Sequence, residues 1–333
     1  MVAVGAAIAA AALLPARGAA APPTRPNHVE PGQVRLEHHT LHVKGTEAND
    51  AIALRLAAGN PAVVQVDLGD NGSADFSFPR AAIRSISVKA RSGNDRVRID
   101  DTNGAFTNAI PTRIDGGPGN DTIAGGAGAE TLNGGSGNDT IDGNGGNDVS
   151  DLGAGDDTFV WDPGDGSDTI EGNDGRDTMV FNGAAAAETV DLSANGNRLR
   201  FFRQPANITM DTGGVEFVTF NALGGADNVT VNNLTGTDVI SVDLNLAGAL
   251  GGTAGDGQID HVTVNGTDGD DAFTVAGALG DVNVTGQTPV VELLHAEATD
   301  QLDFETFSGI DTVASGGLTA GTIQLFLDGI SIP

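Results

Sequence analysis

GGPGNDTIA-GGAGAETLN-GGSGNDTID-GNGGNDVSD-LGAGDDTFV, residues 116–160, is the stretch that decides the fold. It contains five consecutive blocks of nine residues, and the acidic residue at the sixth position recurs at a fixed step of nine. After Trp161 and Asp162, two further blocks follow, PGDGSDTIE (163–171) and GNDGRDTMV (172–180). A short period repeated in this way predicts a solenoid, in which successive blocks stack on one another.

Each block combines a turn with a short strand. The first six residues are rich in glycine, which reaches positive φ at little steric cost and lets another backbone approach closely. The next three residues, such as Thr140-Ile141-Asp142, suit a strand whose central side chain faces one side. We therefore expect two blocks to make one circuit of a flattened spiral, with strands of successive circuits paired in parallel.

The central strand residues predict the core of this spiral. The apolar residues expected to face inward are Ile123, Leu132, Ile141, Phe159, Ile170 and Met179. Ser150 interrupts the series, which predicts a weak point in the core.

The acidic residues of alternate blocks are expected on opposite edges of the spiral. One edge would carry Asp121, Asp139, Asp157 and Asp177, and the other Glu130, Asp148 and Asp168. Neighbouring carboxylates repel each other, and a divalent cation between them turns repulsion into coordination. Ca²⁺ accepts six to eight oxygen ligands in tolerant geometry, whereas Mg²⁺ requires a near-ideal octahedron. Zinc prefers nitrogen and sulfur ligands, which the repeat lacks, so the pattern predicts bound Ca²⁺.

The blocks resemble the G-G-x-G-x-D-x-U-x repeat of the RTX, or haemolysin-type, calcium-binding family, where U is a large apolar residue. This resemblance implies a parallel β-roll in which Asp side chains bind Ca²⁺. It assigns the ligand role to Asp121, Asp139, Asp148, Asp157, Asp168 and Asp177. Glu130 departs from the pattern through its longer side chain. Trp161-Asp162 adds two residues to a strand, which predicts that the metal-binding gap spanning them is distorted or empty.

The charge excludes several classes of partner. The chain has 16 Lys and Arg against 45 Asp and Glu, a net charge of −29. Nucleic acid and anionic membranes are therefore not expected partners, because both bind through cationic surface. There is no cysteine, which excludes disulfides and thiolate metal sites.

The chain is expected to be all-β, a parallel β-roll or β-solenoid with flanking β-rich regions. Residues 1–21 read as a signal peptide, since the apolar run Val2 to Leu14 is followed by a small-residue cleavage site at Ala19-Ala20-Ala21, although no Lys or Arg precedes the run. Pro-rich residues 22–33 predict a linker. Residues 34–113 form an N-terminal β-rich region, 114–182 the β-roll, and 183–333 a C-terminal β-rich region. The segment VKGTEANDAIAL (43–54) is similar to VNGTDGDDAFTV (264–275), and both ARSGNDRVR (90–98) and LGGADNVTV (223–231) echo them more weakly. The flanks are thus either degenerate copies of the repeat or ordinary β-turns.

No catalytic motif is present: the chain contains neither H-E-x-x-H nor G-x-S-x-G. The one histidine cluster, HHTLH (38–42), lies in a strand-like segment that would point His38 and His39 to opposite faces. The function expected is a secreted, non-enzymatic calcium-binding repeat protein, extracellular or at the cell surface, in which Ca²⁺ drives folding. The alternative is a fragment of a larger secreted RTX enzyme or toxin whose catalytic part lies elsewhere. A polysaccharide-active β-solenoid is a third hypothesis, and the sequence points to no particular protein or polysaccharide partner.

Overall fold

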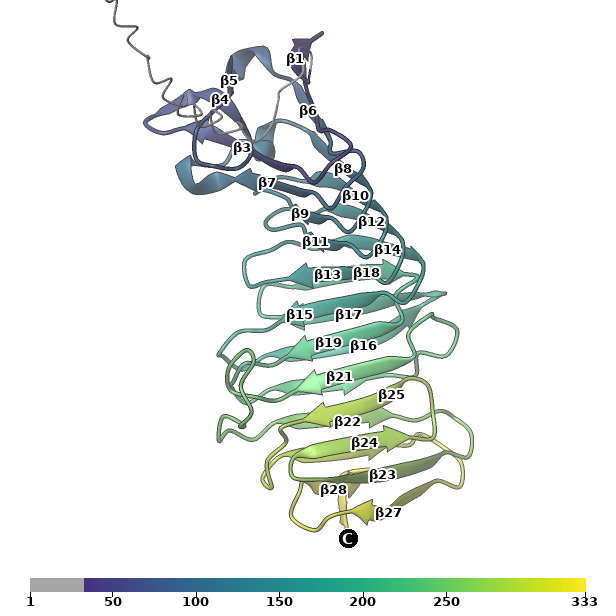
Figure 1. Cartoon of the computed structure of the whole chain (residues 1–333). Helices are drawn as coiled ribbons and strands as arrows, with labels where there is room; N and C mark the ends of the chain where they lie inside the picture. The colour runs from purple at the N-terminus through teal and green to yellow at the C-terminus, as the bar shows by residue number, and fades with distance from the viewer. Residues whose placement is uncertain (1–32) are drawn as a thin grey trace, which may run out of the picture.

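The computed structural model describes residues 33–333, which form an elongated β-solenoid built from two facing sheets (Figure 1). Through the repeats, successive strands alternate between the sheets, and neighbouring strands within each sheet are parallel. The predicted all-β class and parallel β-roll are therefore confirmed. Residues 1–21 of the predicted signal peptide, and the predicted linker up to residue 32, lie outside the described residues.

The two sheets together contain all the strands of the described chain. In spatial order, the first sheet holds β1 (Val34–Glu37), β2 (Thr40–Lys44), β6 (Ser85–Lys89), β8 (Thr112–Pro118), β10 (Glu130–Ser136), β12 (Val149–Ala154), β14 (Thr169–Asp174), β18 (Ile208–Gly213), β17 (Arg198–Gln204), β16 (Thr189–Asn195), β20 (Asn228–Val231), β22 (His261–Asn265), β26 (Gln301–Glu305), β28 (Gln324–Leu327) and β29 (Ile330–Ile332). The second sheet holds β27 (Thr312–Leu318), β23 (Ala272–Ala278), β24 (Asp281–Thr285), β25 (Val290–Leu294), β21 (Ser241–Asn245), β19 (Phe217–Asn221), β15 (Thr178–Asn182), β13 (Thr158–Trp161), β11 (Thr140–Asp142), β9 (Thr122–Ala124), β7 (Arg96–Asp100), β3 (Ala51–Ala57), β4 (Asn60–Leu68) and β5 (Phe76–Pro79).

In the described residues, helical structure is confined to short 3-10 turns between strands of the N-terminal part. They are η1 (Arg80–Ala82), η2 (Asp101–Asn103) and η3 (Thr107–Ala109). Within residues 33–333, no helix has the length and apolar character needed to span a bilayer.

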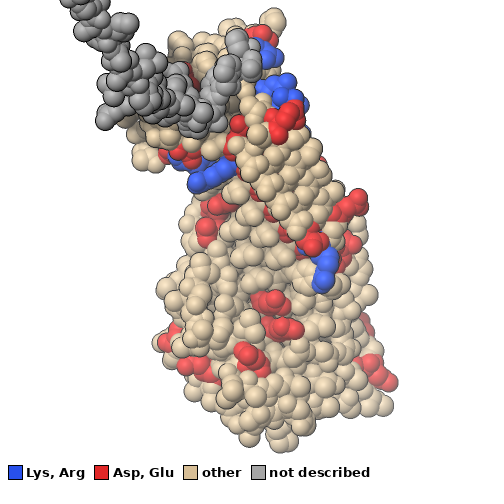
Figure 2. All heavy atoms as spheres, in the orientation of Figure 1, with Lys and Arg blue, Asp and Glu red and all other residues tan. Residues whose placement is uncertain are grey.

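Charge is distributed unevenly along the solenoid. Lys and Arg occur up to Arg203, whereas residues 204–333 contain neither. On the face shown in Figure 2, the basic side chains lie toward the N-terminal end, and the C-terminal end displays acidic side chains alone. The C-terminal part therefore has no Lys or Arg with which to balance its carboxylates.

The nine-residue period of the sequence corresponds to half a circuit. Ile141 of β11 pairs with Ile123 of β9 on one side and with Phe159 of β13 on the other. In the opposite sheet, Leu132 of β10 pairs with Ile114 of β8. Strand partners are thus two blocks apart, which confirms the predicted spiral.

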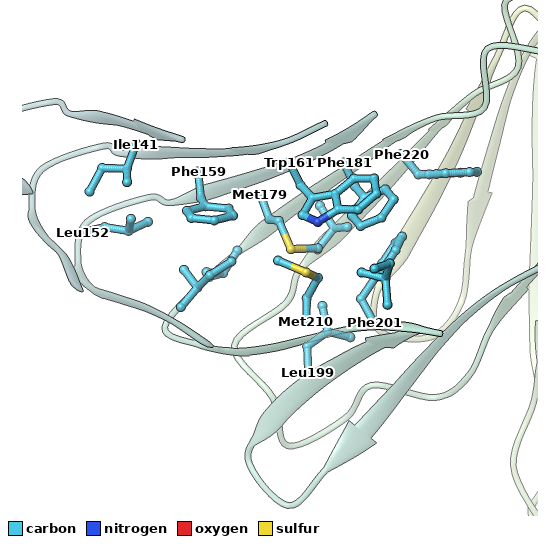
Figure 3. Packing of buried hydrophobic residues seen from close by; sticks show 14 of the residues in the cluster. Ile141, Leu152, Phe159, Trp161, Met179, Phe181, Leu199, Phe201, Met210 and Phe220 are labelled. Atoms are coloured by element: carbon cyan, nitrogen blue, oxygen red, sulfur yellow. The ribbon is translucent and has the colours of Figure 1, made fainter. Parts of the chain in front are cut away.

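The core lies between the two sheets, where each of the six residues predicted to face inward is 0% exposed. Ser150 is also 0% exposed, and its hydroxyl has no hydrogen-bond partner. Leu152, two residues further along β12 and therefore on the same face, is fully buried as well. Figure 3 shows Leu152 pointing into the interior with Ile141 and Phe159. The apolar side chain missing at position 150 is thus replaced by one from the same strand.

The two extra residues at Trp161-Asp162 extend a strand and enlarge the core. Trp161 ends β13 and stacks on Phe181 of β15, with ring centroids 3.9 Å apart and an interplanar angle of 7° (Figure 3). Its indole Nε1 donates a hydrogen bond to the carbonyl of Gly166 at 2.8 Å. The insertion therefore adds an aromatic layer without interrupting the stack of strands.

The flanking regions continue both sheets and add antiparallel excursions to them. These excursions are β3–β4–β5, β16–β17–β18 and β23–β24–β25. The expectation of a continuous strand through HHTLH is wrong at its start, because His38 and His39 have φ of 48° and 67°. They form the two-residue turn between β1 and β2, where positive φ at both positions matches the twist of a hairpin.

Candidate metal-binding turns

The turns of the repeats form two edges of the solenoid. We call the turns that lead from the first sheet to the second the first edge, and the turns that lead back the second edge. The first edge carries Asp121, Asp139, Asp157 and Asp177, and the second carries Glu130, Asp148 and Asp168. All seven side chains are at most 2% exposed. The six aspartates predicted as ligands thus lie in two buried rows, one on each edge.

A ladder of hydrogen bonds links the acids of each row. On the first edge, the backbone N–H of Asp139 donates to Oδ1 of Asp157 at 2.6 Å, and that of Asp121 donates to Oδ1 of Asp139 at 2.7 Å. On the second edge, Asp148 donates to Oδ1 of Asp168 at 2.8 Å. In each linked pair, Oδ1 of the later acid accepts the backbone N–H of the earlier acid. One carboxylate oxygen therefore fixes the position of the preceding turn on the same edge.

The interval that spans Trp161-Asp162 is not distorted in this ladder. The N–H of Asp157 donates to Oδ1 of Asp177 at 2.9 Å across twenty residues, compared with eighteen between Asp139 and Asp157. The expected distortion is absent because Trp161 enters the core and Asp162 joins the following turn, where its N–H donates to Asp165 Oδ2.

The second oxygen of each predicted ligand has no partner. Oδ2 is buried and makes no hydrogen bond in any of the six aspartates, Asp121, Asp139, Asp148, Asp157, Asp168 and Asp177. An unsatisfied buried polar group costs about 1–3 kcal/mol, and a charged one costs more. The six oxygens in the two rows would therefore be stabilised by a cation or by a bound proton.

The pKa values of the acids in the rows are raised for the same reason. Burial, followed by repulsion from Asp168, Glu130 and Asp165, raises the pKa of Asp148 to about 8. Burial, with repulsion from Asp121 and Asp157, raises the pKa of Asp139 to about 7. Without a cation, these carboxyls therefore hold protons near neutral pH.

The backbone of the turns explains why this oxygen is free. In the turns of all six aspartates, the second residue has positive φ, and these residues are Gly117, Gly135, Asn144, Gly153, Gly164 and Asn173. We call this the open turn. The turn of Glu130 is different, because the N–H of Gly126 donates to Glu130 Oε2 at 2.8 Å. We call a turn with this internal bond a closed turn. The departure of Glu130 from the motif thus accompanies a turn that satisfies one oxygen of its own acid.

Close stacking of the turns brings peptide carbonyls to the same place. A Cβ added to Gly137 would overlap the carbonyl oxygen of Gly119 in the preceding turn, and Gly137 has φ of 124°. Only glycine permits this approach. Residues 33–333 contain no group of three or more His, Cys, Asp or Glu arranged to hold one ion. A cation between two turns would therefore be held by at most two carboxylates, together with carbonyl oxygens.

The donor set tests which metal fits. Every candidate donor is oxygen, the spacing is adaptable, and the carboxylates carry the charge. Ca²⁺ takes six to eight oxygen ligands, including backbone carbonyls, in flexible geometry. Zinc prefers nitrogen and sulfur ligands in a tetrahedral arrangement, so the residues present fit Ca²⁺ better.

The rows extend beyond the repeats, which the sequence indicated only weakly. The N–H of Asp50 donates to Asp95 Oδ1 at 2.7 Å, and the N–H of Asp95 donates to Asp121 Oδ1 at 2.8 Å. Asp95 Oδ2 is buried without a partner, and Arg91, the second residue of its turn, has φ of 87°. The segment 90–98 therefore forms the same open turn as the repeats. Asp95 was missed because Ala90 and Arg91 replace the first two expected glycines, and Ser92-Gly93-Asn94-Asp95 was the signal that could have found it.

Comparison with known protein families supports calcium as the metal that these turns fit. A family model for the RTX calcium-binding nonapeptide repeat, in four copies, matches residues 113–141, 125–159 and 164–183. No curated protein matches the chain.

Proposed function

Because the chain carries RTX calcium-binding nonapeptide repeats, we propose that it is a secreted, non-enzymatic protein whose β-roll folds when Ca²⁺ binds. Asp121, Asp139, Asp148, Asp157, Asp168 and Asp177 are the proposed ligands. The observation that carries the proposal is the buried, unpartnered oxygen that each of the six retains. The lack of known catalytic motifs in the sequence supports a binding role and not a catalytic one.

The physical basis is linkage between the metal and folding. Bound Ca²⁺ supplies the positive charge that the rows lack. The aspartates hold the turns in register through Oδ1 and leave Oδ2 for the metal. A ligand that binds only the folded state stabilises it by mass action, by about 2.7 kcal/mol at a hundredfold excess over Kd. Extracellular calcium modules often have Kd values of about 10⁻⁴–10⁻³ M. The chain would accordingly fold at extracellular calcium concentrations and stay unfolded where calcium is scarce.

Calcium titration by calorimetry tests the ligand assignment. Asp148→Asn keeps an acceptor oxygen for the N–H of Glu130, which lies 2.6 Å from Oδ1, but removes the charge. We expect this variant to bind fewer calcium ions per chain than the wild type. The matched control is Asp50→Asn, because Thr46 already donates to Asp50 Oδ2 through its hydroxyl at 2.9 Å. Equal calcium uptake by Asp148→Asn and the wild type would contradict the assignment.

The coupling of calcium binding to folding is tested separately from the secretion of the chain. Circular dichroism of the full chain should show β structure in calcium that is lost in EDTA, and an unchanged spectrum would refute the coupling. Secretion predicts a mature chain in the culture medium that begins after Ala21. Retention of the entire chain inside the producing cell would refute secretion.

A further inference from the structure

The second edge continues past the repeats into the part of the chain that has no Lys or Arg. The N–H of Glu188 donates to Asp227 Oδ1 at 2.7 Å, and the N–H of Asp227 donates to Asp260 Oδ1 at 2.9 Å. Asp260 in turn donates to Asp300 at 3.1 Å. The ladder seen in the repeats therefore recurs in residues 188–300, where the sequence has no nonapeptide motif.

Two acids of this continuation, Glu188 and Asp300, satisfy both of their carboxylate oxygens within the chain, as does Asp271 on the first edge. Glu188 accepts from Arg203 Nε at 2.6 Å and from the N–H of Ala184 at 3.1 Å. Asp300 Oδ2 accepts from the N–H of Glu297 at 2.6 Å. In the similar turn of β22–β23, Asp271 Oδ2 accepts from the N–H of Thr267 at 2.8 Å. These turns thus need no external partner for their acids.

Asp227 is different. Its side chain is 0% exposed, and its Oδ2 makes no hydrogen bond. Burial, followed by repulsion from Asp260, Glu188 and Asp256, raises its pKa to about 8. Glu188 is already paired with Arg203, and no Lys or Arg follows Arg203 in the sequence. Asp227 therefore has a buried carboxyl oxygen without a hydrogen-bond partner and without a Lys or Arg to pair with.

The turn of Asp227, residues 222–227, also has the open conformation. Its second residue, Leu223, has φ of 62°, although bulky residues rarely occupy this region. In the six open turns of the repeats the same position is Gly or Asn. Outside the turn, Asp256 Oδ2 accepts from the N–H of Gly225 at 2.6 Å, which places a second carboxylate beside it. Strained backbone held in this way is typical of binding sites.

We infer that turn 222–227 binds a further Ca²⁺ ion, outside the nonapeptide repeats, through the unpartnered Oδ2 of the buried Asp227. Asp256, which lies against the same turn, supplies negative charge next to the ion. The rest of the shell consists of peptide carbonyls, as in the repeat turns. This site is separate from the repeats, so it can be present or absent independently of them.

The test uses the full chain and Ca²⁺ as the probe. Equilibrium dialysis at about 10 mM calcium, at least tenfold above the weakest Kd of extracellular modules, about 10⁻³ M, gives the number of ions per chain. Asp227→Asn, which keeps an acceptor for Glu188, should bind one ion fewer than the wild type. Asp271→Asn, whose carboxylate is already satisfied by Thr267, should bind as many ions as the wild type.

Hydrogen exchange locates the effect and shows whether the variant is folded. Calcium should slow exchange in peptides that cover residues 222–227 of the wild type and of Asp148→Asn, but not of Asp227→Asn. The repeat peptides of Asp227→Asn should remain protected by calcium. Undiminished calcium uptake, or calcium-dependent protection of 222–227 that persists in Asp227→Asn, would overturn the inference and leave the proposed function intact. A wild-type chain that takes up no calcium would overturn both.

Discussion

At the scale of the residue, the repeat motif determines which carboxylate oxygen of its aspartate stays without a hydrogen-bond partner. The sixth-position aspartate uses Oδ1 for the ladder and keeps Oδ2 unpartnered wherever the second residue of the turn has positive φ. Where that residue is Thr46 or Thr267, its N–H reaches the carboxylate instead. In these turns, one backbone dihedral thus separates an aspartate whose Oδ2 lacks a partner from an aspartate whose Oδ2 has one.

Ser150 offers a test of the core at this scale. Its hydroxyl is buried without a hydrogen bond, and alanine would fill nearly the same volume. We expect Ser150→Ala to raise the free energy of unfolding in calcium by about 1 kcal/mol, because it removes an unsatisfied buried polar group. Urea denaturation measures the change. Ser136→Ala, at an exposed position, should leave stability within about 0.5 kcal/mol. Destabilisation by Ser150→Ala would show that the hydroxyl has an undetected partner.

At the scale of the element, one block is a turn and a strand, and neither is stable by itself. The strands of the repeats are as short as the three residues of β9 and β11, so the stacking of turns must hold the register. This stacking depends on glycines whose hydrogen atoms face the carbonyl of the preceding turn. The nine-residue period made the stacking predictable from sequence, because glycine and aspartate recur at fixed positions.

Two glycines allow a matched comparison of this close approach. Gly137 has φ of 124°, and a Cβ there would overlap Gly119 O. Gly145 has no atom nearer than 3.5 Å to an added Cβ. We expect Gly137→Ala to lower the free energy of unfolding by about 2–4 kcal/mol, within the range of strained backbone substitutions, and to weaken calcium binding. Gly145→Ala should change stability by less than about 1 kcal/mol. Thermal unfolding in calcium measures both, and equal effects would contradict the role assigned to stacking.

At the scale of the whole molecule, the sequence predicted the repeats better than the flanks. The fixed step of nine predicts the strands, the inward residues and the two acidic rows from the sequence alone. The open turns at Asp95 and Asp227 were not predicted, because Arg91 and Leu223 occupy a position where the motif has glycine. The replacement of Ser150 by Leu152 in the core could not be read from the motif either, since residue 152 normally belongs to the turn.

The acidic rows also determine how the calcium-free chain responds to pH. Carboxyls whose pKa in the folded state is raised from 3.8 to about 7 and about 8, as in Asp139 and Asp148, hold protons that the unfolded chain has released. Stability then falls as pH rises from about 4 to about 8. We expect the calcium-free chain to show more β structure by circular dichroism at pH 5 than at pH 8. In calcium the order should reverse, because the metal requires deprotonated ligands. A calcium-free chain that is more folded at pH 8 would refute this account, and Asp148→Asn should weaken the pH dependence.

The ladder has a consequence for how the array fills. Each aspartate after the first in a row belongs to its own turn and accepts a hydrogen bond from the preceding turn. Every interval between two turns therefore shares residues with the neighbouring intervals. Ordering one interval prepares the geometry of both neighbours, as expected of a linear array with nearest-neighbour interactions. Occupancy should therefore spread cooperatively from an initial nucleus, with a Hill coefficient above one, and the array would act as a concentration threshold for calcium.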